Sequence, residues 1–200
     1  MNNIILNSIL IQDVLGEISP ISQHTAIALL SATEIKKLEK NILIETSGQQ
    51  IKYQFVVVDG IIRKFLTNAN GEEFTIDFFC KGQAITPSLL RSIDFVSFVN
   101  LQVVSDEATV LFFSLREMEA KMQINKDLEL FGYKVMMQDA YKRAEREKIL
   151  LTASGIEKLQ WFRKNYPNLE NEIPHYYIAS FLGMTPTSLS RLRTPLKKNK

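Results

Sequence analysis

The chain has 200 residues, of which 46% are hydrophobic, and its formal net charge at pH 7 is +2. This length and apolar content suffice for one large domain or two small ones with real cores. No apolar run approaches the ~18 residues that cross a membrane, and the first residues lack the basic start and cleavage site of a signal peptide. The single cysteine, Cys80, excludes an internal disulfide and any cysteine-ligated cluster or zinc site. We therefore expect a cytoplasmic protein that does not associate with a membrane.

The charge is divided unevenly along the chain. Residues 1–141 contain 12 Lys and Arg against 17 Asp and Glu, a net charge of −5. Residues 142–200 contain 12 against 5, a net charge of +7. A basic segment of this kind is typical of a DNA-binding module, and the alternative is a solvated basic face.

Two helices are predicted in the first forty residues. Residues 3–15 are mostly apolar and indicate a short helix. Ser31 and Glu34 have the spacing of a capping box, which predicts a second helix over residues 32–40. Residues 19–22 between them are predicted to form a loop.

From residue 41 the apolar pattern changes from a helical to a strand-like period. The predicted strands cover residues 41–47, 53–58, 61–66, 74–78, 95–104 and 109–113. Glycines at 48, 60, 71 and 82 mark turns at intervals of 12, 11 and 11 residues. Short strands and turns at this spacing predict an antiparallel sandwich or barrel.

A long helix is predicted after the strands. Ser114 and Glu117 again have capping-box spacing and begin a short helix, and Asn125 can cap a long one over about 126–150. This helix has two apolar stripes, one through Leu128, Phe131 and Val135 and one through Leu130, Met137, Ala144 and Leu151. Two apolar faces usually have two partners, here the helix's own barrel and the same helix of a second chain. The alternative is a single buried helix in a monomer.

The C-terminal part is predicted to be helical, with a helix over about 153–165, a loop over 166–174, and then two short helices. In the first of these, Ile178, Phe181 and Leu182 form one apolar face, and Gly183 ends the helix. Thr185 can cap the second, whose outer face is hydroxylic and basic. Hydroxyls and helix N-terminal amides hold phosphates, and arginine can read guanine bidentately. The alternative is a helical hairpin that packs on a larger domain.

This order of parts resembles the Crp/Fnr superfamily of bacterial transcription regulators over nearly the whole chain. The most specific segment, IASFLGMTPTSLSRLR over 178–193, is similar to the variant common in Bacteroidetes, which typically reads IASYLGITPETLSRIR. The resemblance implies an α+β fold with an N-terminal antiparallel β-roll, a jelly-roll-like double-stranded β-helix. It implies a sensor roll with flanking helices over 1–122, a long dimerisation helix over 123–150 and an all-α helix-turn-helix domain over 151–200.

The resemblance also implies a homodimer on a near-palindromic double-stranded DNA site, with RNA polymerase as a further partner. The recognition helix would start near Thr185, and Arg191 would read bases. The family's usual glutamate is replaced by Thr187, whose methyl can meet thymine instead. The residues expected on DNA are Thr185, Thr187, Ser188, Ser190, Arg191, Arg193 and His175. The residues expected in the dimer seam are Leu130, Tyr133, Met137, Ala140, Tyr141 and Ala144.

The sensor departs from the cyclic-AMP-binding members of the family. Those members hold the nucleotide with a glycine-glutamate turn and an arginine-serine pair. The corresponding positions of this chain are Gly82, Gln83, Ala84, Phe98 and Val99. No carboxylate is present there for the ribose hydroxyl and no cation for the phosphate, and the nearby pair Arg91 and Ser92 lies too early unless the loop is shifted in register. The effector is therefore unknown and is not expected to be cyclic AMP. No metal or cofactor is expected.

Two other classes of function remain as alternatives. One is a ligand-binding or interaction module that has the same roll but no DNA function. The other is a metal enzyme of the cupin type, which is disfavoured because residues 41–113 contain no histidine ligand. We therefore do not expect an enzyme.

Overall fold

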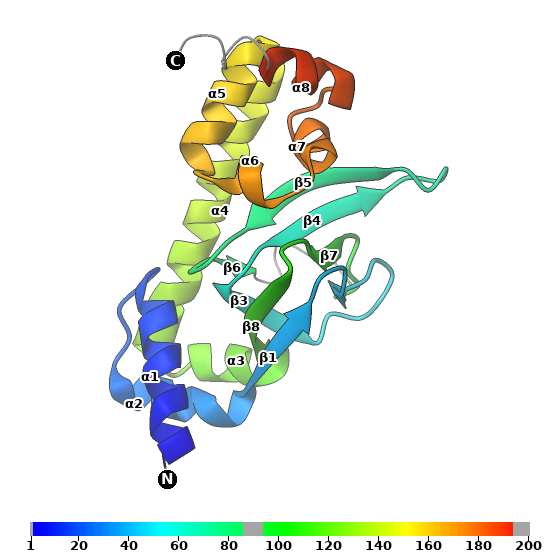
Figure 1. Ribbon diagram of the computed structural model, residues 1–200. Coiled ribbons are helices and arrows are strands. Elements are labelled where there is room, and N and C mark those ends of the chain that lie inside the picture. Colours follow the sequence, from blue (N-terminus) through cyan, green and yellow to red (C-terminus); the bar gives the residue numbers. More distant parts are fainter. Residues whose placement is uncertain (1, 86–93, 194–200) are drawn as a thin grey trace. The chain divides into compact units, whose positions relative to one another are not determined.

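A computed structural model describes residues 2–85 and 94–193 (Figure 1). The chain divides into two compact units, Met1–Lys64 with Phe78–Asp139 and Phe65–Asp77 with Ala140–Lys200. The long helix α4 (Lys126–Thr152) contributes its first half to the first unit and its second half to the second. Among the helices that the structure describes, none combines the length and the apolar character needed to cross a membrane.

In the part of the chain that the structure describes, eight strands form two antiparallel four-stranded sheets, in the orders β1-β8-β3-β6 and β2-β7-β4-β5. Their bounds are β1 Thr33–Glu39, β2 Leu43–Glu45, β3 Tyr53–Asp59, β4 Ile62–Thr67, β5 Glu73–Phe79, β6 Ala84–Ile85, β7 Asn100–Val103 and β8 Glu107–Ser114. The inner strand β8 pairs with β1 on one side, where Thr33 lies opposite Phe113, and with the other inner strand, β3, on its second side, where Val56 lies opposite Leu111. Two packed antiparallel sheets confirm the predicted roll.

The turn glycines have the conformation that their spacing predicted. Gly48, Gly60, Gly71 and Gly82 all have positive φ. At Gly60, between β3 and β4, a Cβ would also lie 2.5 Å from the carbonyl oxygen of Glu107. A side chain at position 60 would therefore clash with the backbone of the neighbouring strand, so glycine is required there.

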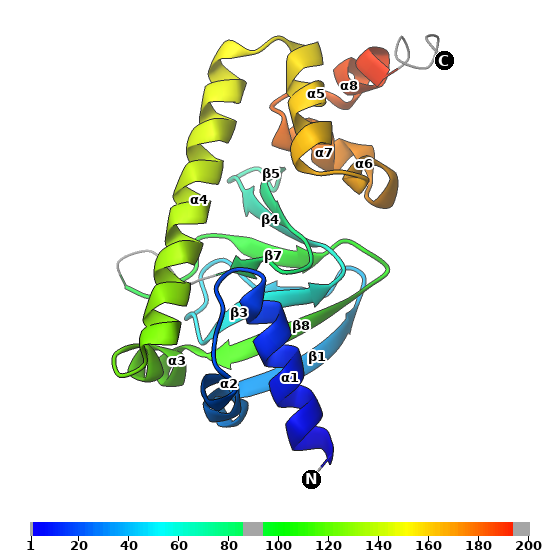
Figure 2. The ribbon, with the colours of Figure 1, turned by 90° about the vertical axis from the view of Figure 1, so that its left-hand side faces the viewer.

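Helices cover one face of the first sheet. They are α1 (Asn2–Gly16), α2 (Gln23–Leu29) with the 3-10 turn η1 (Leu30–Ala32), α3 (Leu115–Met122) and the first half of α4. Figure 2 shows α1 lying across β3 and β8. Ile11 and Leu15 of α1 join Leu111 and Phe113 of β8 and Phe131 of α4 in one buried cluster. The predicted helix over residues 3–15 and the long helix are thus confirmed.

The predicted helix over residues 32–40 is wrong, because this segment forms strand β1. Every residue from Thr33 to Glu39 pairs with a residue of β8. The Ser31–Glu34 capping box does not form, and Glu34 instead pairs with Lys36 at 2.8 Å. Pairing along the whole of β1 outweighs a local capping signal, because all seven residues lie opposite residues of β8 and the backbone groups that face β8 gain hydrogen bonds there.

Three other expectations need correction. Ser114 does not cap α3 with its side chain, because it still belongs to β8, although the helix itself is present. The strand predicted over 95–104 is limited to β7, and Phe95 has a positive φ of 59° that interrupts an extended chain. The loop predicted over 166–174 contains the one-turn helix α6 (Leu169–Glu172).

The second unit has an aromatic core. Its remaining helices are α5 (Gly155–Asn165), α7 (His175–Phe181) and α8 (Pro186–Arg193). The ring of Phe162 lies 5.1 Å from that of Tyr166 and 5.9 Å from that of Phe181, measured between centroids. Arg146 of α4 donates to the carbonyl oxygen of Phe181 at 2.8 Å and lies over its ring. The end of α4 is therefore fastened to α7 by both polar and aromatic contacts.

The segment Phe65–Asp77 takes part in this unit through β5. The backbone N–H of Thr75 donates to the hydroxyl of Ser180 at 2.9 Å. Asp77 is buried, pairs with Lys142 at 2.7 Å and accepts a hydrogen bond from the Tyr166 hydroxyl at 3.3 Å. A buried carboxylate that has both a cation and a hydroxyl donor is well compensated.

Candidate nucleic-acid interface

Helices α7 and α8 are joined by a tight turn. Gly183 has a positive φ of 65°, and the N–H of Met184 donates to the carbonyl of Ala179 at 3.0 Å. This bond and the one from the N–H of Gly183 to the carbonyl of Ser180, at 3.1 Å, satisfy carbonyls at the end of α7, as expected where a glycine ends a helix. Leu182 before the turn and Leu189 after it are buried, so the two helices pack against each other. The two-helix motif predicted from the sequence is present.

The start of α8 is capped as predicted. The hydroxyl oxygen of Thr185 accepts from the backbone N–H of Ser188 at 3.1 Å and lies 2.9 Å from the Ser188 hydroxyl. The N–H of Leu189 donates to the carbonyl of Thr185 at 3.0 Å, which closes the first turn. Both hydroxyls are exposed, so they remain accessible to a phosphate while they hold the helix start in place.

The outer face of α8 is exposed and polar. Thr187, Ser190 and Arg191 all lie on the solvent side, whereas Leu189 is buried. The neighbouring helix α7 adds Tyr176, whose side chain is 53% exposed. Sequence reasoning missed Tyr176, although helical spacing would have found it. Tyr177 lies one turn before Phe181 on the buried face, which leaves Tyr176 outside.

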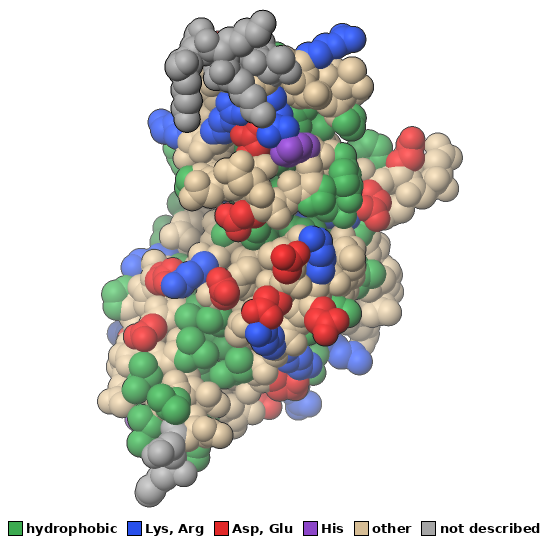
Figure 3. Space-filling model, in the orientation of Figure 1, with side chains coloured by type: hydrophobic (Ala, Val, Ile, Leu, Met, Phe, Trp, Pro, Cys, Tyr) green, Lys and Arg blue, Asp and Glu red, His purple; other side chains and the backbone are tan. Residues whose placement is uncertain are grey.

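A cluster of charged side chains joins α5, α6 and α8. Glu170 of α6 accepts two hydrogen bonds from Arg163 of α5, at 2.6 and 2.9 Å, and one from Arg193 at the end of α8, at 2.5 Å. The hydrogen bonds from Arg163, followed by those from Arg193, hold the pKa of Glu170 below its usual value. Figure 3 shows basic side chains and a histidine gathered on this part of the molecule.

His175 joins the same cluster through both ring nitrogens. Nη1 of Arg193 lies 2.8 Å from Nδ1 of His175, and Nε2 of the ring lies 3.1 Å from the carbonyl oxygen of Glu170. A guanidinium can only donate, so Nδ1 must accept and the proton of the neutral ring lies on Nε2. Two residues expected on DNA, His175 and Arg193, thus contact Glu170, which sequence reasoning did not single out.

The residues expected in the dimer seam all lie on one exposed face of α4. Tyr133 is 62% exposed and Met137 is 53% exposed. The remaining residues, Leu130, Ala140, Tyr141 and Ala144, are also exposed. The other apolar stripe is buried in the core of the first unit. The helix therefore has one packed face and one apolar face in contact with solvent.

The positions that the resemblance assigns to the cyclic-AMP site, Gly82, Gln83, Ala84, Phe98 and Val99, carry no charged side chain. Gln83 folds back on its own turn, where its side-chain oxygen accepts from the N–H of Cys80 at 2.8 Å. Gly82 donates to the carbonyl of Val57, which ties this turn to β3, and Ala84 begins β6. Val99 is buried and apolar, and Phe98 is exposed. The residues between β6 and Asp94 lie outside the described part of the chain.

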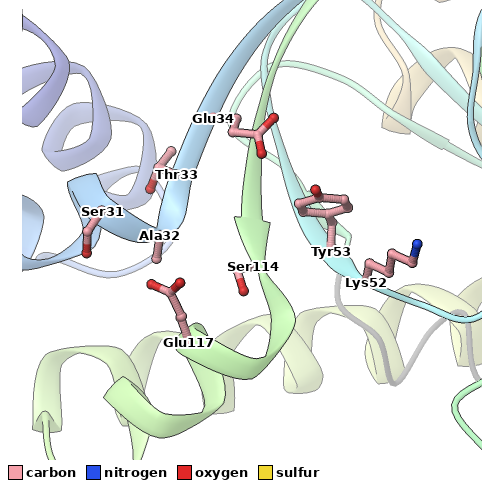
Figure 4. Close-up of a pocket in the computed structure, with 8 residues that line it drawn as sticks. All are labelled: Ser31, Ala32, Thr33, Glu34, Lys52, Tyr53, Ser114 and Glu117. Atoms are coloured by element: carbon pink, nitrogen blue, oxygen red, sulfur yellow. The ribbon is translucent and has the colours of Figure 1, made fainter.

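The first unit also carries a small polar pocket of about 250 Å³ (Figure 4). Its lining residues are Ser31, Ala32, Thr33, Glu34, Lys52, Tyr53, Ser114 and Glu117. Its wall is mainly hydroxylic, and the carboxylate of Glu34 is paired with Lys36, which lowers its pKa. In the parts of the chain that the structure describes, no group of three or more His, Cys, Asp and Glu could hold a metal.

No family model and no curated protein matches the chain, but solved structures do. FixK2 from Bradyrhizobium japonicum matches with a TM-score of 0.72 and 14% identity, over 83% of this chain and 85% of that one. A transcriptional regulator of the crp/fnr family from Eubacterium rectale matches with a TM-score of 0.69 and 14% identity, over 88% and 84%. CLP from Xanthomonas campestris, described as a c-di-GMP responsive global regulator, matches with a TM-score of 0.68 and 11% identity, over 89% of this chain and 93% of that one. The chain therefore has the fold of the Crp/Fnr regulators, as the sequence resemblance predicted.

Proposed function

We propose that the protein is a DNA-binding transcription regulator of the Crp/Fnr type. The observation that carries this proposal is the helix α8, which is capped at Thr185, packed through Leu189 and polar on its exposed face. A short helix of this design fits the major groove of DNA, and its N-terminal amides suit a phosphate. The net charge of +7 over residues 142–200 supports the same partner.

Within α8 the residues take different roles. Arg191 is exposed in the last turn of α8 and is proposed to read a guanine. Thr187 stands where its methyl group can meet a thymine, and Ser190 is exposed beside it. Thr185 and Ser188 are proposed to contact the backbone phosphate at the helix start. Tyr176 of α7 is added to these as a backbone contact, because it is exposed on the helix that crosses the backbone in this motif.

The test of this assignment is binding by Arg191→Ala to a site selected from random duplexes. Loss of one bidentate base contact costs about 1–3 kcal/mol, so discrimination against an unrelated duplex falls roughly 5- to 150-fold for each half-site. Lys164→Ala is the matched control, because it removes an exposed cation of α5 in the same unit. We expect it to weaken binding to both duplexes equally. Equal effects of the two variants on discrimination would contradict the assignment.

The active form is proposed to be a homodimer joined along the exposed apolar face of α4. A two-fold dimer would place the two α8 helices about one turn of DNA apart, ~34 Å, on a near-palindromic site. Met137→Glu introduces a charge at the seam and is expected to raise the dimer dissociation constant about 100-fold, or ~2.7 kcal/mol. Gln138→Glu adds the same charge elsewhere on the helix and should leave the dimer intact. Sedimentation velocity over a range of concentrations distinguishes these outcomes.

The effector of the roll is proposed not to be cyclic AMP. Gln83 is used to cap its own turn, and Val99 is buried and apolar. Neither position supplies the carboxylate or the cation that a cyclic nucleotide needs in the family's pattern. The proposal therefore leaves the chemistry of the input open and assigns the output to α8.

A further inference from the structure

Glu170 lies where three helices of the second unit meet. Its carboxylate accepts from Arg163 of α5 and from Arg193 of α8, and its carbonyl lies within hydrogen-bond distance of His175 of α7. The side chain is 12% exposed, so most of the carboxylate is shielded from water. Charge-assisted bonds of this kind are shorter and stronger than neutral ones, and the bond pattern from Arg163 is bidentate.

Arg193 stands at the end of α8 opposite the Thr185 cap. The helix has eight residues, and its described anchors are the cap at the start, the buried Leu189 in the middle and the Arg193–Glu170 ion pair at the end. A helix of about two turns that is fixed at both ends has a defined direction. Without the ion pair, the end of α8 would lose its charge-assisted anchor to α6.

We propose that Glu170 is a positioning residue for the recognition helix. It holds Arg193 away from the DNA backbone and fixes the direction in which α8 presents Arg191. This inference rests on the DNA-binding function proposed above. Arg193 then acts through the fold of the domain, and Arg191 remains the arginine that reaches the bases.

Without the carboxylate of Glu170, Arg193 would be a free cation that can bind a DNA phosphate. With both guanidinium groups on one carboxylate, the side chains of Arg163, Glu170 and Arg193 carry a net charge of +1. Replacing the carboxylate with an amide leaves +2 and releases a cation at the end of α8. A free cation beside the duplex binds phosphates of any sequence, which strengthens non-specific binding and steepens the dependence on salt.

Glu170→Gln therefore has a distinctive signature in DNA binding. We expect its affinity for an unrelated duplex to rise and its discrimination for the selected site to fall about 10-fold. The slope of log K against log salt, between about 50 and 200 mM, should steepen by about 0.9 for each subunit, the value for one further phosphate contact, and so by about 1.8 for the proposed homodimer. Adding Arg193→Gln to this variant removes the freed cation, so the slope should return to the wild-type value while discrimination stays low.

Glu172→Gln is the matched control, because Glu172 is exposed on the same helix α6 and its replacement removes the same charge. It should change binding to both duplexes equally and leave discrimination unchanged. Circular dichroism and thermal unfolding show that each variant is folded at the temperature of the assay.

The inference is overturned if Glu170→Gln and Glu172→Gln give the same discrimination and the same salt slope. It is also overturned if Glu170→Gln weakens binding to both duplexes in proportion, because a residue that only stabilises the fold would behave in that way. If the wild-type protein itself selects no site, the proposed function and this inference both fall. If the wild type selects a site and the Glu170 signature is missing, only the inference falls.

Discussion

The two units hold a shielded carboxylate in opposite ways. Glu45 of β2, in the first unit, is 8% exposed, and burial raises its pKa to about 7, with partial relief from the N–H of Thr46. Among the residues that the structure describes, no cation pairs with it. Glu170, in the second unit, has two arginines, and its pKa is lowered. The same chemical group therefore opposes folding in the roll and supports it in the helical domain at neutral pH.

The difference between Glu45 and Glu170 follows the proposed division of the chain into a sensor roll and a DNA-binding helical domain. In the described part of the roll, Glu45 lies among the strands without a pairing cation, and its burial lowers the stability of the protein at neutral pH. In the helical domain, the ion pairs of Glu170 with Arg163 and Arg193 hold α5, α6 and α8 together. A binding site for DNA of the kind proposed above needs helices that are fixed in direction. Replacing carboxylates with amides tests this contrast, because the group keeps its shape and loses its charge.

The largest effect is expected from Glu45→Gln. The unfolded chain releases this proton near pH 4.5 and the folded chain near pH 7, so the stability of the wild type falls as the pH rises through that window. The amide should stabilise the protein by on the order of 2–3 kcal/mol at pH 8 and by almost nothing at pH 4.5. Urea unfolding at a series of pH values measures this. A variant that is less stable than the wild type at pH 8 would contradict the contrast.

Glu170→Gln should act in the opposite direction. A lowered pKa contributes stability that is present above the unfolded value of 4.5 and is lost as the pH falls through the folded value. We expect destabilisation of about 1–2 kcal/mol at pH 7, since the arginines are partly exposed to solvent, and a smaller difference in acid. Urea unfolding over the same series of pH values measures this. Equal stability of variant and wild type at pH 7 would contradict the claim that Glu170 stabilises the helical domain.

The smallest effect is expected from Glu34→Gln. Glu34 also has a lowered pKa, through the side chain of Lys36, but both side chains of this ion pair are well exposed. Water screens such a pair and its net contribution to stability is small. We expect no measurable shift in the thermal midpoint. A clear loss of stability would show that ion pairing alone, without shielding, accounts for the behaviour of Glu170.

The sequence predicted the parts of this molecule whose signals are local. Gly183, the Thr185 cap and the apolar positions through Leu189 set the two C-terminal helices within about twenty residues, and the turn glycines marked the strands. Residues 33–39 were mispredicted because their partner, β8, lies some seventy residues away and its ladder overrides a local capping pattern.

The charged cluster could not be predicted for a related reason. Arg163, Glu170 and Arg193 are spread over thirty residues, and only the packing of α5, α6 and α8 brings them together. Nothing in the spacing of Glu170 distinguishes it from Glu172, which lies on the same short helix and is exposed. The sequence places Arg193 two residues after Arg191 on the same helix, and this spacing led to the prediction that it contacts DNA. The sequence does not show that Glu170 of α6 lies beside Arg193.

DNA recognition by α8 is tested most sharply by a selection of duplexes from a random pool by the purified wild-type protein at low salt. We expect enrichment of a two-fold symmetric site whose half-sites lie about one DNA turn apart, ~10 base pairs between centres. Retention of duplexes without any enriched sequence would show that the basic segment binds charge alone. That result, or no binding at all, would contradict α8 as a reader of DNA.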